Sequence, residues 1–337
     1  MKNKIFLGVF LFLISISKLV HAQYVNYGID KPAFERFEAA PTLYVVLTGH
    51  NVFDEALRDA ISRYWKIKPY LFIDSSEAKK KLIDPTFCFL KIETKKIIVA
   101  YNSDIGGGST DTYWGTNMGI FIGGPGSIEI DKGALARGYT APGCEFVLAE
   151  APFDAHGLNK NLDGTDKNIE DAIYKLPLMV KGFNDVLSFV KTNSLKGYGG
   201  IFRRKYCGQI SANASILKNK TLLVLDSLNV ITGKMERLHT TTVTKEIMQK
   251  YPYKYRYVTK AELDDLIKQR SKDYCFFDPC LSFNRHIIVY DLESLSLIYI
   301  KLETYLVKKG LTSFESFVYE DEIADLVSAI NGKYKAD

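Results

Sequence analysis

An internal repeat constrains the fold of this chain more than any other feature of its sequence. Residues 63–92 and residues 250–279 resemble each other at a constant offset of 185, and two extra residues in the second copy shift the match near its end. Coincidence between common α/β patterns is the alternative, but the shared order of elements favours duplication. The matched positions are Tyr70 with Tyr255, Phe72 with Tyr257, Ile73 with Val258, Glu77 with Glu262, Leu82 with Ile267, Cys88 with Cys275 and Phe89 with Phe276.

Each copy begins with a pattern typical of a strand, a helix and a second strand. The run LYVVL is short, apolar and rich in β-branched residues, as in a strand covered on both faces. Apolar residues then recur at three- and four-residue steps from Phe53 to Trp65, which indicates a helix with one apolar stripe. Asn51 is its candidate N-cap, and Pro69 excludes its continuation. In the second copy, TKAE from Thr259 onward is typical of a capping box.

The later part of each copy changes pattern. Short β-rich runs follow one another without helices, which indicates hairpins that extend the sheet in antiparallel fashion. A helix closes each copy, with apolar stripes at 173–190 and 323–330 and a kink expected at Pro177. The predicted fold class is therefore α/β (α+β mixed), with two tandem, duplicated modules. Each module is expected to hold a mixed sheet of about five strands in the order β-α-β-α-β-β-β-α.

The repeat also divides the chain into segments. About 315 residues remain after the first 22, which is more than one ordinary domain, so two are expected. The predicted segments are a signal peptide at 1–22, an N-terminal arm at 23–40, α/β module 1 at 41–192, a linker at 193–219, α/β module 2 at 220–332 and a C-terminal tail at 333–337.

The first residues have the pattern of a secretory signal peptide. Two lysines precede an apolar run at 5–17, which is shorter than the ~20 residues of a membrane span. Small residues at −3 and −1 predict cleavage between Ala22 and Gln23. An uncleaved anchor helix is the alternative. The mature protein is expected to be exported, to the periplasm or the extracellular space, and to have no transmembrane segment.

Charge and cysteine content limit the function classes. The chain has 44 Lys+Arg and 39 Asp+Glu; three lysines leave with the signal peptide, so the mature net charge is 41 − 39 = +2. This charge is too small to predict a nucleic-acid surface. Five cysteines leave at least one thiol unpaired. Cys88 and Cys275 lie in apolar runs and are interpreted as buried packing residues, with a Cys275–Cys280 disulfide as the alternative.

Residues Asp104 to Thr112 read DIGGGSTDT. This stretch resembles a phosphate-binding loop of the actin and Hsp70 superfamily of ATPases, and the resemblance implies backbone amides that approach a phosphate. The match covers nine residues. The superfamily's earlier Asp-x-Gly loop has only GIDKP, from Gly28 onward, as a counterpart, and its late Gly-Gly contact has none after Gly200. The sequence therefore favours a surface loop, and no cofactor is predicted.

The segment NKNLDGTDKNIE fits the spacing of an EF-hand calcium loop, with Gly164 at the turn. Its first position is Asn where the motif has Asp, and only two of the nominal ligands carry formal charge, so any affinity would be weak. A solvated loop that leads into the next helix is the alternative. The candidate ligands are Asn159, Asn161, Asp163, the Thr165 carbonyl and Glu170.

The sequence contains neither a Gly-x-Ser-x-Gly elbow nor a phosphate-binding P-loop. Four histidines, His50, His156, His239 and His286, follow the signal peptide, and none has the spacing of a zinc motif. The predicted function is an exported non-catalytic binding or scaffold protein of unknown ligand. It would bind an unknown protein or envelope ligand through a groove between the modules or through the glycine-rich loops. The alternative is a hydrolase whose site is assembled from distant residues, such as Asp154 and His156.

Overall fold

The computed structural model describes eleven stretches of the chain. They are residues 31–101, 109–124, 146–154, 170–193, 200–226, 228–231, 237–240, 243–281, 285–302, 318 and 320–334. The predicted signal peptide at 1–22 and the cleavage point lie outside these residues, as do most of the glycine-rich and calcium loops.

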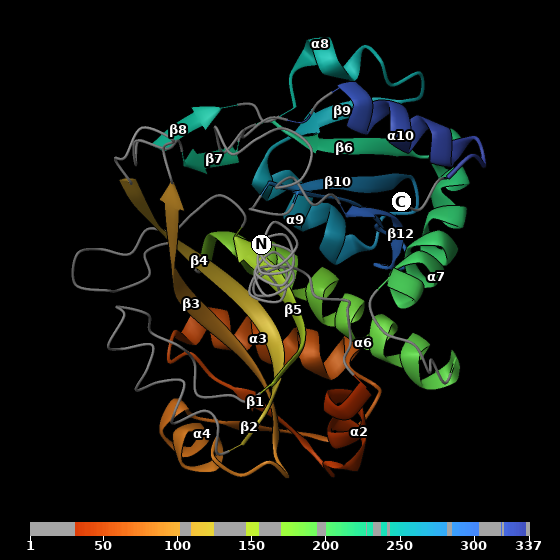
Figure 1. Cartoon of the computed structure of the whole chain (residues 1–337). Coiled ribbons are helices and arrows are strands. Elements are labelled where there is room, and N and C mark those ends of the chain that lie inside the picture. The colour runs from red at the N-terminus through yellow and green to blue at the C-terminus, as the bar shows by residue number, and fades with distance from the viewer. Residues whose placement is uncertain are drawn as a thin grey trace, which may run out of the picture.

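The first module is one mixed sheet with helices on both faces (Figure 1). Its strand order is β2-β1-β3-β4-β5, with β1 parallel to β2 and β3, and with β3-β4 and β4-β5 antiparallel. The elements are β1 (Leu43–Val46), α3 (Asn51–Tyr64), β2 (Tyr70–Ile73), α4 (Ser75–Lys81), β3 (Cys88–Tyr101), β4 (Ser109–Ile122), β5 (Phe146–Asp154), the 3₁₀ helix η1 (Glu170–Lys175) and α6 (Leu176–Asn193), preceded by α2 (Lys31–Ala39).

The second module repeats this topology. Its sheet has the order β9-β6-β10-β11-β12, with the same parallel and antiparallel pairs. The elements are β6 (Thr221–Leu225), α8 (Lys245–Met248), β9 (Tyr255–Val258), α9 (Lys260–Gln269), β10 (Tyr274–Leu281), β11 (Arg285–Asp291), β12 (Leu297–Leu302) and α10 (Glu320–Ile330). The mixed α/β fold with two tandem sheets is thus confirmed. The first module has the predicted element order, and the second has it with an added hairpin after its first strand.

The strand registers match between the modules. Leu43 pairs with both Tyr70 and Cys88 in the first sheet, and Leu222 pairs with both Tyr255 and Cys275 in the second. These are the positions that the repeat matched in the sequence. The equivalence is what duplication predicts, and a common origin of the two modules stays a proposal.

The modules differ between their first two strands. Where the first has the 14-residue helix α3, the second has a separate hairpin, β7 (Leu228–Ile231) and β8 (Arg237–Thr240), followed by the single turn α8. The segment predicted as a linker contains two helices, α7 (Gly200–Ser211) and the 3₁₀ helix η2 (Ala212–Lys218). Tyr206, Ala214 and Leu217 anchor them in the core. Sparse apolar spacing hid these helices in the sequence.

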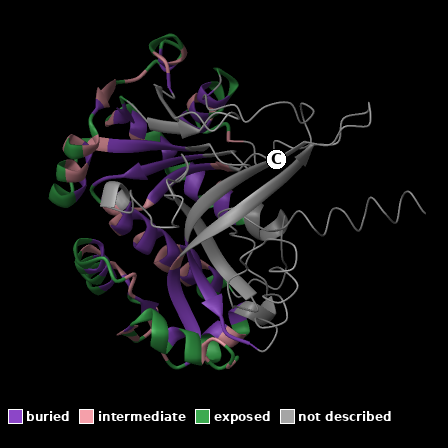
Figure 2. Cartoon of the chain, turned by 90° about the vertical axis from the view of Figure 1, so that its left-hand side faces the viewer, coloured by how far each residue is buried: buried purple, intermediate pink, exposed green. Residues whose placement is uncertain are grey.

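The two sheets stack in the same sense. Helices α3 and α6 cover one face of the first sheet, and that face packs toward the opposite face of the second sheet, which α9 covers. The other face of the second sheet carries η2, α8 and α10. Buried residues run through both sheets, and exposed residues gather on the outer helices (Figure 2).

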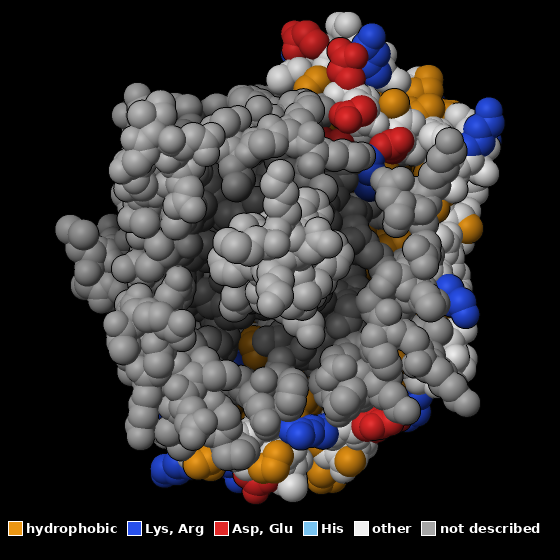
Figure 3. All heavy atoms as spheres, viewed as in Figure 1, with side chains coloured by type: hydrophobic (Ala, Val, Ile, Leu, Met, Phe, Trp, Pro, Cys, Tyr) orange, Lys and Arg blue, Asp and Glu red, His pale blue; other side chains and the backbone are white. Residues whose placement is uncertain are grey.

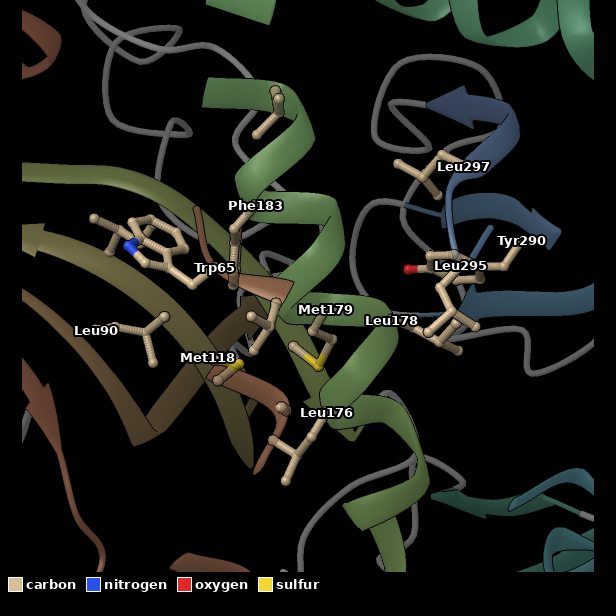
Figure 4. Close-up of a cluster of buried hydrophobic side chains, with 14 of the residues drawn as sticks. Trp65, Leu90, Met118, Leu176, Leu178, Met179, Phe183, Tyr290, Leu295 and Leu297 are labelled. Carbon is tan, nitrogen blue, oxygen red and sulfur yellow. The ribbon is translucent and has the colours of Figure 1, made fainter. Parts of the chain in front are cut away.

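Helix α6 joins the two cores because it is buried on two sides. Met179 and Phe183 point toward Met118 and Trp65 of the first module, whereas Leu178 points toward the β11–β12 turn of the second (Figure 4). One hydrophobic cluster contains all of these residues. The described residues therefore pack the two modules against each other at the boundary where a groove was expected.

Of two local predictions about the helices, one stays a prediction and one was wrong. The kink expected at Pro177 stays a prediction; Pro177 is the second residue of α6, next to the change from the 3₁₀ helix η1 to α6. Asn51 is already inside α3, and His50 occupies the N-cap position without a side-chain cap. Asp54 instead accepts hydrogen bonds from the backbone N–H groups of Thr48 and Gly49, at 2.8 and 2.9 Å.

Candidate functional site

The strands β3 and β4 form a ribbon that extends beyond the rest of the first sheet. Among the described residues, β1 pairs with β3 only over Cys88–Leu90, and β5, which is described as far as Asp154, pairs with β4 only from Thr116 to Ile122. The β3–β4 pairing continues without either neighbour from Lys95↔Gly115 to Tyr101↔Ser109. At about 3.4 Å per residue, this ribbon is roughly 20 Å long.

The ribbon is specific to the first module. In the second, the equivalent pair β10–β11 ends at Leu281↔Arg285, and β12 already pairs with β11 from His286 onward. In Figure 1 the ribbon runs up the left side of the molecule to the level of the second sheet. The sequence pattern predicted separate short strands here. An uninterrupted run without Gly or Pro from Cys88 to Tyr101 was the signal for one long strand.

A buried ion pair connects η1 of the first module to β10 of the second. The Nζ of Lys175, the last residue of η1, lies 3.1 Å from Oδ1 of Asp278 in β10. Both residues are buried. Removing one partner of such a pair typically costs 3–5 kcal/mol, because the other charge stays buried. The pair therefore sets the position of η1 relative to the second sheet.

Aromatic rings pack beside the pair. Tyr174 meets Phe276 edge to face at 6.4 Å between ring centroids, and Phe276 stacks with Tyr290 at 6.5 Å. Nearby, Lys181 of α6 contacts the Asp185 carboxylate and donates to Ser296 Oγ at 3.2 Å. Polar and aromatic contacts thus hold η1 and α6 against the second module. We interpret this region as a structural junction between the modules.

The predicted calcium ligands lie mostly outside the described residues. Four of them lie outside the described residues: Asn159, Asn161, Asp163 and Thr165. Glu170 is the first residue of η1. The calcium site stays a prediction. The segment that carries it joins β5 to η1, so the Lys175–Asp278 pair anchors its carboxyl end.

The predicted phosphate loop closes the ribbon. Residues 104–108 lie outside the described residues, whereas Ser109 to Thr112 begin β4. Because Tyr101 pairs with Ser109, residues 102–108 connect two antiparallel strands.

The histidines are distributed over both modules. His50 is exposed at the start of α3, His239 lies in β8 and His286 lies in β11. His156 is outside the described residues, and Asp154 ends β5 opposite Thr116. In the part of the chain that the structure describes, no cluster of three or more His, Cys, Asp or Glu side chains could hold a metal ion.

The described thiols are buried packing residues. Cys88 and Cys275 are free thiols, and Cys207 is also buried. Burial raises the pKa of Cys88 to about 11 and that of Cys275 to about 12. A Cys275–Cys280 disulfide does not form, because both residues belong to β10 and a strand separates residues five apart by roughly 16 Å.

Comparison of the chain with known protein families, with curated proteins and with solved structures found no match. Among the residues that the structure describes, no helix is both long and apolar enough to span a bilayer.

Proposed function

We propose that this chain is an exported, non-catalytic binding or scaffold protein, and that the β3–β4 ribbon is its binding element. The observation that carries the proposal is the pairing beyond Lys95↔Gly115, where neither β1 nor the described part of β5 contributes a strand. A ribbon of this kind offers backbone N–H and C=O groups along its edges, and an extended segment of another polypeptide can pair with them.

The rest of the molecule suits a scaffold. A shared core and the Lys175–Asp278 pair hold the two sheets as a fixed support. Ribbon strands on a fixed support need little ordering when a partner binds, and lower ordering costs favour affinity. The predicted signal peptide places this activity outside the cytoplasm, where the partner is a protein of the cell envelope or its surroundings.

Shortening the ribbon tests the proposal. Thr94 and Thr116 face each other in the register, so an Asn-Gly turn can replace residues 95–115 and close the hairpin. We expect the shortened chain to fold, with far-UV circular dichroism and thermal unfolding close to those of the parent. We expect it to lose the proteins that co-purify with the parent from its own cell envelope.

A matched control changes the equivalent turn of the second module. Residues 282–284 connect Leu281 to Arg285, which are also paired, and an Asn-Gly turn there should leave the co-purified proteins unchanged. Retention of the same partners by the ribbon-shortened chain would contradict the proposal. So would hydrolysis of an ester, phosphate or peptide substrate that His156→Ala abolishes, because that outcome supports the hydrolase alternative.

A further inference from the structure

Because the two sheets stack in the same sense, each end of the molecule has an outer face whose equivalent in the other module is buried at the centre. Helix α4 covers the outer face of the first sheet, and its equivalent in the second module, α9, lies in the shared core. Helix α10 covers the outer face of the second sheet, and its equivalent, α6, lies between the sheets. The α10 face is thus the counterpart of the α6 side of the first module, which packs against the second sheet. The α4 face is the counterpart of the α9 side of the second module, which packs against α6.

The α4 end is basic and partly apolar. The repeat aligns Leu263 and Leu266 of α9 with Ala78 and Lys81 of α4, which ends in Lys79, Lys80 and Lys81. The Lys81 ammonium lies 5.5 Å from the centre of the Tyr44 ring and 5.0 Å from that of Phe87. Two large apolar residues are exposed beside this helix: Leu71, opposite Tyr44 in the sheet, at 55%, and Ile83 at 46%.

The α10 end has an acidic helix terminus, where Glu320 lies 3.9 Å from the Nζ of Lys250. Its first turn contains Glu320, Asp321 and Glu322. Aligning the residues that pack on each helix's own sheet sets Leu176, Met179 and Phe183 of α6 opposite Ile323, Leu326 and Ile330 of α10. In that alignment Leu178 corresponds to Asp325. Figure 3 shows acidic side chains over α8 and α10 at the top of the molecule with basic ones among them, and basic, acidic and hydrophobic side chains along its lower edge.

In the same alignments, the residues at the two ends of the molecule that correspond to Lys175 and Asp278 carry the opposite charges. Lys175 of η1 corresponds to Glu322, and Asp278 of β10 corresponds to Lys91 of β3. The central junction therefore pairs a base from the first module with an acid from the second. Two copies stacked in the same way would bring Glu322 of one toward Lys91 of the other, with the charges exchanged. Lys91 and Glu322 also make contacts inside their own chain.

We propose that a second copy of this chain docks head to tail, its α4 face on the α10 face of the first. Opposite charge brings the faces together, and Leu71 and Ile83 are covered in the contact. Such a contact is heterologous, since the two surfaces differ, and it leaves a free face at each end of every assembly. The product is an open series of oligomers. This inference goes beyond the proposed partner binding, which uses the ribbon.

Sedimentation of the purified chain tests the stacking. At about 20 mM salt, where the Debye length exceeds 20 Å, we expect the weight-average mass to rise with concentration past twice the monomer mass. At about 0.5 M salt, where screening shortens that length to a few ångströms, we expect the monomer. A mass that stays monomeric at low salt, or that stops at the dimer, would overturn the proposal.

Charge reversal identifies the faces. Lys79→Glu with Lys80→Glu makes the α4 face acidic, and Glu320→Lys with Asp321→Lys makes the α10 face basic. We expect each double variant alone to stay monomeric at low salt. An equimolar mixture of the two should assemble again, because each face of one variant then meets an opposite face of the other.

Two controls keep the result specific. Lys268→Glu with Lys272→Glu changes the same net charge on exposed lysines at the end of α9, away from both outer faces, and should assemble like the parent. Circular dichroism checks that every variant is folded. Assembly that survives the α4 reversal contradicts the proposal. Binding of the α4 face to anionic phospholipid vesicles by a chain that never self-associates would do the same, and would assign the face to a membrane surface.

Discussion

The thiols of Cys88 and Cys275 occupy matching places in the two sheets. Cys88 pairs with Leu43, the first residue of β1. Cys275 pairs with Leu222, the second residue of β6, and each thiol side chain is fully buried. The apolar runs around them predicted this burial correctly. Burial disfavours the thiolate, and the carboxylate of Asp291 adds to the effect at Cys275.

These pKa shifts predict a loss of stability in alkali. The ordinary thiol pKa is 9.0, so above that pH the unfolded chain releases protons that the folded chain keeps until about pH 11 at Cys88. The free energy of unfolding should therefore fall as pH rises from 9, by roughly 1.4 kcal/mol per pH unit for each thiol. Urea titrations between pH 8 and about 10.5 measure this slope.

The double variant Cys88→Ala with Cys275→Ala is the comparison. Its free energy of unfolding should be lower at pH 8, because the core loses two sulfur atoms, but its decline with pH should be shallower. An equal slope in the parent and the variant would show that other groups cause the decline.

At the scale of elements, the caps show what sequence patterns can and cannot specify. Thr259 caps α9 as predicted, accepting from the backbone N–H of Glu262 at 3.2 Å. The Glu262 carboxylate does not complete the capping box; it contacts Arg256 of the neighbouring strand. Asp54 reaches back to the turn before α3, where Gly49 has a positive φ of 88°. Asp54 lies only five and six residues after the groups that it accepts from, but the N-cap pattern suggested Asn51 instead.

Replacing Asp54 should loosen the β1–α3 turn. Asp54→Ala removes acceptors from two backbone N–H groups and from Thr48 Oγ1, at 2.8 Å. We expect a loss of about 1–2 kcal/mol in the free energy of unfolding, the range found for helix caps. Asn51→Ala is the matched control and should cost less than half as much. Equal costs would restore Asn51 as the cap.

At the scale of the whole molecule, the sequence predicted the topology of each module but not how the modules meet. Alternating strands, caps and matched positions are local signals. Leu178 belongs to the same apolar helix as Met179 and Phe183, and its position on the opposite side is visible only when both sheets are present. The ribbon was missed for a related reason, because the length of a hairpin beyond its sheet depends on where its neighbours end.

A shared core predicts that the two modules unfold together. We expect one thermal transition, with coincident changes in far-UV circular dichroism and in the fluorescence of tryptophan, of which Trp65 lies in the first module's core. Leu178→Asp gives α6 the residue that α10 has at the matched position. It should lower the free energy of unfolding by at least 2–5 kcal/mol, the range for loss of a buried leucine, and separate the transition into two.

Leu326→Ala removes a leucine of α10 that packs only on the second sheet. It should lower stability by about 2–5 kcal/mol while the transition stays single. Two transitions in the parent chain, or one in Leu178→Asp, would show that the junction does not couple the modules.

The double-sided burial of α6 also affects how the chain can be synthesised. A ribosome completes this helix long before it reaches Leu295, which lies 295 − 178 = 117 residues after Leu178. At 5–20 residues per second, the nascent first module would wait on the order of ten seconds for the surface that covers its leucine. During that interval Leu178 faces solvent or a chaperone, so translation rate and chaperone supply should influence the yield of folded protein more than the stability of the finished molecule suggests.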